Sequence, residues 1–143
     1  YEWKREGNAR RPFAIHLRDQ PIMAVAGVWE RWQPASHLPP IHSFSIVTTA
    51  ANDFMADIHD RMPVILAQRD IDHWLDPDVH EPERVLPLLR PCPSEWLTAY
   101  EVSTSVNSVR HKAADVLRRL ETNSGQRSIS ERRVGTAIRT EIP

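Results

Sequence analysis

The balance of proline and glycine is the sequence feature that most constrains the fold. The chain has twelve prolines but only four glycines. Proline fixes φ and removes a backbone donor, so it stiffens loops and ends helices, whereas glycine loosens a chain. Pro34, Pro39 and Pro40 all fall between residues 33 and 42, between two apolar segments. We therefore predict loops that proline fixes rather than loops that glycine loosens.

The first third of the chain has the pattern of antiparallel strands. Residues 1–3 resemble the end of a strand, and residues 4–11 resemble a polar hairpin connection with a Gly7–Asn8 turn. Residues 12–18 alternate apolar and polar positions, the period of a half-buried strand. Residues 22–32 are more apolar and predict a central strand. The three segments together predict an antiparallel meander.

The rest of the chain mixes short strands with short helices, and 143 residues are enough for one domain with an ordinary core. We therefore predict an α+β fold with a mixed, mainly antiparallel sheet and several short peripheral helices. The expected elements are strands at 43–48, 62–66 and 96–102, a helical turn at 52–58, and helices at 69–75, 82–89 and 112–120. Residues 121–143 form a polar, basic tail, either disordered or in contact with a nucleic-acid backbone.

Charge and composition exclude several classes of protein. The net charge of −1 gives no global attraction to nucleic acid, so any DNA contact must be local. The single cysteine, Cys92, excludes an intramolecular disulfide, and its place between two prolines offers no activating base. No apolar run approaches the roughly 20 residues of a membrane span. His37 and His42 lack cysteine partners, so we expect no metal and no cofactor.

Three short segments carry residue types suited to chemistry. His59 lies among acids in the run 57–63 and suits a general acid or base, although the run could also be a solvated polar loop. Glu2, on a strand between two aromatics, is a proton donor if its face is buried and an ordinary edge residue if it is not. Thr48 could present a hydroxyl to a phosphate or simply end a strand. The five tryptophans could stack on bases, but core filling is the expected duty of most.

Taken together in order and spacing, several motifs resemble the SRAP family (SOS response-associated peptidase). The resemblance covers roughly residues 1–120, which we treat as one domain before the 121–143 tail. The motifs are Tyr1-Glu2-Trp3-Lys4, Ala26-Gly27-Val28-Trp29-Glu30, Thr48-Thr49-Ala50-Ala51-Asn52, His59-Asp60-Arg61-Met62-Pro63 and Ser103-Thr104-Ser105-Val106-Asn107.

The resemblance implies a mainly antiparallel sheet or partial barrel and an abasic-site function. SRAP proteins recognise abasic sites in single-stranded DNA, and their N-terminal cysteine forms a thiazolidine crosslink with the open sugar and removes a leader peptide by autoproteolysis. Glu2 and His59 would be catalytic. Arg61, Thr48 and Trp3 would contact the DNA. We expect a cytoplasmic, nucleoid-associated protein.

The family's N-terminal Cys-Gly-Arg block and the Asn-Ala-Arg block after it have no counterpart in this sequence. We therefore expect the chain not to form the crosslink alone, and we expect exposed strand edges to favour self-association. Whether it acts as an enzyme is left open by the sequence. The alternative is a non-catalytic module that binds single-stranded DNA or another partner.

Overall fold

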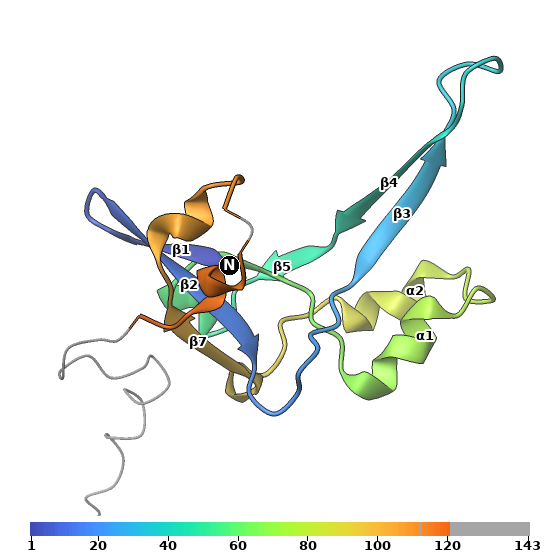
Figure 1. Ribbon diagram of the computed structural model, residues 1–143. Helices are drawn as coiled ribbons and strands as arrows, with labels where there is room; N and C mark the ends of the chain where they lie inside the picture. The colour runs from blue at the N-terminus through green and yellow to red at the C-terminus, as the bar shows by residue number, and fades with distance from the viewer. Residues whose placement is uncertain (112, 121–143) are drawn as a thin grey trace, which may run out of the picture.

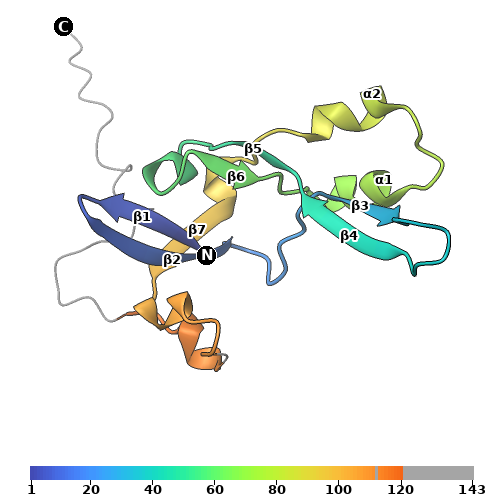
Figure 2. The same cartoon turned by 90° about the horizontal axis from the view of Figure 1, so that it is seen from above.

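The computed structural model describes residues 1–111 and 113–120. Strands β1, β2 and β7 form one lobe, and α1 and α2 lie at the opposite end of the molecule (Figure 1). Seen from above, β5 and β6 lie between the two ends (Figure 2). The predicted tail at 121–143 lies outside the described residues.

Seven strands form three separate antiparallel sheets, of three, two and two strands, among the described residues. The sheet orders are β1-β2-β7, β3-β4 and β5-β6. The predicted α+β class with antiparallel sheets is confirmed, and these sheets do not close into a barrel within the described part of the chain. The strands are β1 (Glu2–Glu6), β2 (Ala9–Leu17), β3 (Gly27–Trp32), β4 (Ile41–Ile46), β5 (Thr48–Ala50), β6 (Arg61–Pro63) and β7 (Leu97–Glu101).

The Gly7–Asn8 turn of the β1–β2 hairpin forms as predicted, but the strands extend to Glu6 and from Ala9, so the predicted connection at 4–11 is too long. Glu6 pairs with Ala9, which leaves Gly7 and Asn8 as a two-residue turn. Gly7 has a φ of 61°, in the left-handed region that such a turn requires and that glycine adopts without a steric penalty. The turn sets the register of the whole hairpin, including the pairing of Glu2 with Phe13.

The predicted meander is wrong, because β2 pairs with β7 and not with β3. Phe13 and Leu17 of β2 are buried, and so are Leu97 and Ala99 of β7. These side chains share one face of the sheet and form part of a single core cluster. Burial of this apolar surface favours the long-range pairing over a local one with β3.

The prediction of a central strand at 22–32 is also wrong. Residues 22–26 are not part of a strand, and all six residues of β3 are exposed. With β4 it forms a two-stranded ribbon that projects from the rest of the molecule (Figure 1). Apolar composition alone cannot distinguish a central, covered strand from a strand of an exposed two-stranded ribbon, because tertiary contacts decide what covers a strand.

The core joins the β1-β2-β7 sheet to the segment around β6. Its larger cluster contains Phe13 and Leu97 from the sheet, Met55 and Ile58 from the turn before β6, and Met62 from β6 itself. A smaller cluster of Ala26, Val64 and Leu66 packs against residues of α1 and η3. The turn that contains His59 is thus anchored to the same core as β2.

The helices are short and peripheral, as predicted. The predicted helix at 112–120 is wrong: residues 114–117 form a single 3₁₀ turn, and Leu120 donates a backbone hydrogen bond to the carbonyl of Glu101 instead. No helix in the described residues is long and apolar enough to cross a membrane. The helices are η1 (Met55–Asp57), η2 (Gln68–Asp70), α1 (Ile71–Leu75), α2 (Pro82–Val85), η3 (Leu86–Leu88), η4 (Ser94–Trp96), η5 (Thr104–Asn107) and η6 (Ala114–Leu117).

Candidate functional site

Arg61 and Thr48, two predicted DNA contacts, lie together at the paired strands β5 and β6. The Arg61 Nη2 donates to the Thr48 hydroxyl at 2.7 Å and to its carbonyl at 2.9 Å, and Nε donates to the same hydroxyl at 3.2 Å. Strand alternation directs the exposed Arg61 outward, while its neighbour Met62 is 1% exposed and anchors β6 in the core. A rigid strand therefore holds the guanidinium in one orientation.

This arrangement leaves hydrogen-bonding capacity facing solvent. The Arg61 Nη1 makes no hydrogen bond within the described residues. The Thr48 hydroxyl accepts from Arg61, so its own proton remains available for donation. A positive guanidinium beside a free hydroxyl proton is suited to an anionic oxygen such as that of a phosphate.

His59 lies two residues before β6, and its Nδ1 has partners both as an acceptor and as a donor. When Nδ1 carries no proton, it accepts from the backbone N–H of Arg61 at 3.1 Å. When Nδ1 is protonated, it can donate to the Asp60 carboxylate at 3.0 Å. The other ring nitrogen, Nε2, has no hydrogen-bond partner in the part of the chain that the structure describes. Nδ1 therefore has a partner whether it accepts or donates, and Nε2 stays open to a substrate.

Glu2 lies at the start of β1, half-buried, on the face of the sheet that packs against the core. It pairs with Phe13, and one core cluster contains both Phe13 and Ile58, the residue before His59. No hydrogen bond or ion pair among the described residues joins Glu2 to His59. The convergence of these two side chains on one substrate therefore stays a prediction.

Trp3 lies on the opposite face of β1 from Glu2. Its indole Nε1 donates to the Asn107 Oδ1 at 2.8 Å, which ties β1 to η5. Sequence reasoning assigned no role to Asn107, because 104 positions separate the pair and no local pattern indicates such a contact. Trp3 therefore does not share a face with Glu2, as the alternation of side chains along a strand predicts.

Cys92, the chain's single cysteine, is a buried structural residue. It is 5% exposed, and burial raises the pKa of its thiol to about 11. The Asn52 side chain donates to the Cys92 carbonyl at 2.8 Å and accepts from the Met55 backbone N–H at 2.9 Å, so it caps the turn before His59. A protonated, enclosed thiol is a poor nucleophile near neutral pH.

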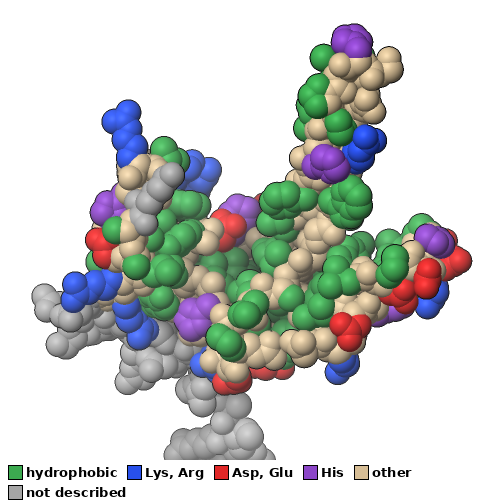
Figure 3. Space-filling view, turned by 45° about the vertical axis from the view of Figure 1, so that its right-hand side comes forward, with side chains coloured by type: hydrophobic (Ala, Val, Ile, Leu, Met, Phe, Trp, Pro, Cys, Tyr) green, Lys and Arg blue, Asp and Glu red, His purple; other side chains and the backbone are tan. Residues whose placement is uncertain are grey.

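The expected core role for most tryptophans is wrong for the ribbon. Trp29 and Trp32 are 74% and 55% exposed. Hydrophobic side chains on the projecting ribbon are visible in Figure 3.

No group of three or more His, Cys, Asp or Glu side chains that could hold a metal occurs among residues 1–111 and 113–120. Proton transfer and anion binding are the chemistry that the described residues around His59 and Arg61 can provide.

Comparison with known proteins identifies one family. The model of the family described as SOS response associated peptidase (SRAP) matches residues 1–109. The chain is 40% identical over 118 residues to the abasic site processing protein YoaM of Bacillus subtilis, covering 82% of this chain and 52% of that protein. It is 33% identical over 122 residues to the abasic site processing protein YedK of Escherichia coli, again covering 82% and 52%.

A solved structure agrees with these sequence matches. A crystal structure of a protein from Bacteroides thetaiotaomicron superposes with a TM-score of 0.76 at 29% identity, covering 84% of this chain and 53% of that one. The chain thus spans about half the length of the relatives it matches.

Proposed function

Because this chain belongs to the SOS response associated peptidase (SRAP) family, we propose that it takes part in the processing of abasic sites in single-stranded DNA. The curated relatives are named abasic site processing proteins. The observation that carries the proposal is the pair of Arg61 and Thr48, a prepared site for a phosphate, next to an imidazole with a free Nε2.

Recognition would begin with the DNA backbone. Arg61 would bind a phosphate through Nη1, and Thr48 would donate its hydroxyl proton to the same group. A lesion in a single strand needs no duplex opening, so one fixed cation and a shaped surface suffice to position the sugar. Trp3, with its indole held by Asn107, would offer a stacking surface on the other side of β1.

Covalent attachment, as the family resemblance implies, needs an N-terminal cysteine supplied from outside these residues. Its amine adds to the aldehyde carbon of the open sugar, and loss of one water gives an imine. Its thiol then adds to the imine carbon, forming a C–S bond and leaving the proton on nitrogen. Glu2 and His59 would carry the protons for ring opening and water loss. The same cysteine would act in autoproteolysis.

Arg61→Ala tests the proposed binding site. We expect roughly tenfold weaker, non-covalent retention of a labelled single strand that contains an abasic site, since one phosphate contact is lost. Fluorescence anisotropy at low salt measures this. Arg84→Ala is the matched control, because Arg84 is an exposed arginine on α2 paired with Glu81. Equal binding by both variants would remove Arg61 from the DNA site.

Glu2→Gln and His59→Gln test the catalytic roles in a chain extended at its N-terminus by the unmatched segment of a relative. Each variant should slow covalent attachment to abasic single strands while leaving non-covalent binding intact, because each removes a proton carrier and no phosphate contact. A gel that resolves crosslinked protein provides the rate. Unchanged rates would exclude that residue from the mechanism.

The alternative function is non-catalytic binding of single-stranded DNA by this chain. The exposed Arg61 site and the buried state of Cys92 are consistent with it. Reversible, salt-sensitive retention without any covalent product from the extended chain would favour this alternative.

A further inference from the structure

A pocket separate from Arg61 and His59 lies between the end of β2, the loop after β6 and η4. It has a volume of about 180 Å³ and is lined by Leu17, Asp19, Gln20, Leu66, Ala67, Gln68 and Trp96. Drug-sized ligands occupy sites of roughly 300–1,000 Å³, so this pocket suits a single small ring system. Leu17 and Leu66 are buried and supply an apolar wall.

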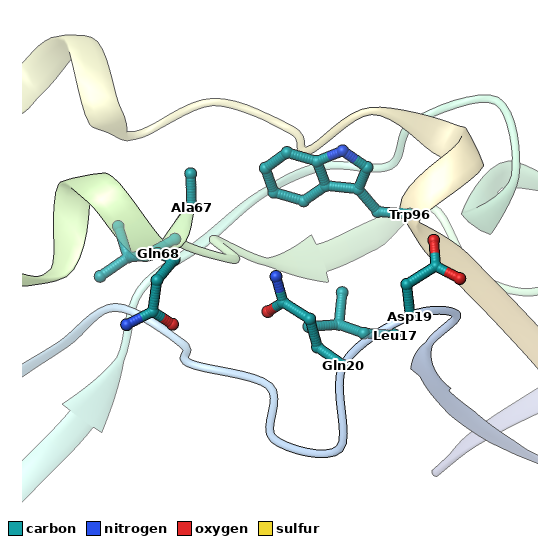
Figure 4. A pocket seen from close by; sticks show the side chains of 7 residues that line it. Leu17, Asp19, Gln20, Ala67, Gln68 and Trp96 are labelled. Atoms are coloured by element: carbon teal, nitrogen blue, oxygen red, sulfur yellow. The ribbon is translucent and has the colours of Figure 1, made fainter.

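The polar groups at this pocket are uncommitted. The amides of Gln20 and Gln68, the carboxylate of Asp19 and the indole N–H of Trp96 have no hydrogen-bond partner within the described residues. Figure 4 shows Gln20 and Gln68 across the pocket from the Trp96 indole. Each amide can donate and accept, whereas Asp19 only accepts. The Trp96 indole can stack on a planar heterocycle, and the amides and the carboxylate can form hydrogen bonds with the edges of that ring.

The backbone of Trp96 is held in place from two sides. Arg18 donates its backbone N–H to the Trp96 carbonyl at 2.8 Å. Its guanidinium donates to the carbonyls of Glu95 at 3.3 Å and Leu97 at 3.2 Å. The Trp96 backbone N–H donates to the Pro93 carbonyl at 3.1 Å. The indole therefore starts from a fixed backbone, which lowers the entropy lost when a ligand stacks on it.

A second cavity shares two walls with the first. It has a volume of about 370 Å³, and Ala67 and Trp96 line both cavities. Arg69, Asp70 and Arg90 line the second one, and the Arg69 Nε lies 3.7 Å from the Asp70 Oδ1. The first cavity thus offers an aromatic wall and amides, and the second offers two arginines against one carboxylate, which suits a base in the first and its phosphate in the second.

We propose that the Trp96 pocket binds a nucleobase with an exocyclic amine, stacked on the indole and hydrogen-bonded by Gln20, Gln68 and Asp19. Asp19 accepts from the amine, and the small volume suits a one-ring base, so the pocket favours cytosine over thymine. Arg69 and Arg90 take the attached phosphate. The base comes either from the strand that flanks a lesion or from a free nucleotide; only the first source rests on the proposed function.

The test follows the indole Nε1–H resonance of Trp96 by NMR, assigned with Trp96→Phe. Deoxycytidine should shift it at millimolar concentration and bind roughly fivefold more tightly than thymidine, and Asp19→Asn should abolish that preference. Gln20 and Gln68 are exposed, so replacing both with leucine should not disturb the core. The double variant Gln20→Leu with Gln68→Leu should bind deoxycytidine roughly tenfold more weakly. Trp29→Phe is the control, since Trp29 lies on the ribbon and its loss should leave binding unchanged.

A second titration distinguishes a base within a strand from a free nucleoside. It uses a short oligodeoxycytidylate that has no abasic site. A Trp96 shift with this strand at lower concentration than with deoxycytidine assigns the pocket to a strand, and a shift with deoxycytidine alone assigns it to free nucleosides. Arg61→Ala should leave deoxycytidine binding unchanged. A failure of the proposed abasic-site function can therefore be told apart from a failure of the Trp96 pocket to bind a base. No shift with either probe, or equal shifts in the double glutamine variant, would overturn the proposal.

Discussion

At the scale of single residues, burial decides what each reactive side chain can do. Cys92 and His59 illustrate the contrast: the thiol is enclosed in the core, whereas the imidazole is 44% exposed and keeps one ring nitrogen free. The sequence already favoured these two roles, because Cys92 lies between two prolines without an activating base, whereas His59 lies among acids. The surrounding packing makes one group structural and leaves the other available to a substrate.

Cys92 should make stability depend on alkaline pH. Burial raises its pKa to about 11 from an ordinary value near 9, so the folded thiol keeps a proton that the unfolded chain loses. The unfolded state then binds fewer protons, and stability should fall between about pH 9 and pH 11 by on the order of 2 kcal/mol. Urea unfolding of the wild type and Cys92→Ala at several pH values measures this difference, and parallel curves would contradict it.

At the scale of elements, one arginine joins three strands. Arg11 of β2 donates to Glu6 of β1 at 2.9 and 3.0 Å and to Glu101 of β7 at 2.7 Å through Nε. A second, shorter contact joins Arg11 Nη2 to Glu101 Oε2. These carboxylates raise the pKa of the guanidinium, which stays charged. Glu101 pairs with the core residue Phe13, and the Arg11 guanidinium carbon lies 5.8 Å from the centre of the Phe13 ring, so the network borders the apolar core.

Arg11→Met should destabilise the fold by about 1–3 kcal/mol, because it leaves the half-buried Glu101 carboxylate without its cation. Arg84→Met is the matched control: Arg84 and Glu81 are 52% and 62% exposed, so its effect should be within about 0.5 kcal/mol. Urea unfolding compares the two. A similar small loss in both variants would show that the network does not stabilise the sheet.

The β3–β4 ribbon should promote self-association. Trp29 and Phe44 are directly paired on one face and are 74% and 77% exposed, and both strand edges lack a partner among the described residues. Trp29→Ser with Phe44→Ser should reduce the concentration dependence of sedimentation while changing stability by less than about 1 kcal/mol. Unchanged sedimentation would exclude the ribbon as the contact.

A buried aromatic provides the contrast for the ribbon. Phe13→Ala removes a side chain that is only 7% exposed and should cost roughly 3–5 kcal/mol in unfolding experiments. A stability loss confined to Phe13→Ala would show that the ribbon contributes little to the fold of this chain.

At the scale of the whole molecule, the balance of charge limits how DNA can bind. A net charge of −1 provides no long-range attraction, so the DNA binding proposed above would depend on a local cation such as Arg61. Counter-ion release then involves few phosphates. The logarithm of affinity for single strands should fall with the logarithm of salt concentration at a slope of about −0.7 to −2, corresponding to one to three phosphates.

Anisotropy titrations from low to moderate salt measure this slope, and Arg61→Ala should reduce its magnitude by roughly 0.7. A slope near −5 would indicate an extended basic surface instead of one local site. It would then direct attention to the basic residues at 121–143, which lie outside the described part of the chain.

The sequence alone determined the features that depend on near neighbours. The Gly7–Asn8 turn and the alternating strand that follows it depend on turn geometry and side-chain alternation, which act over a few residues. The ordered motifs also sufficed to indicate the family.

Only the tertiary structure decided which strands pair and what covers them. The partner of β2 is β7, about 80 positions away, and the apolar β3 projects without a core. Local pattern carries no information on such pairings, because the free energy of burying Phe13 and Leu17 with Leu97 depends on chain segments that meet only on folding. For the same reason, the contact of Trp3 with Asn107 and the Trp96 pocket could not be predicted from the sequence.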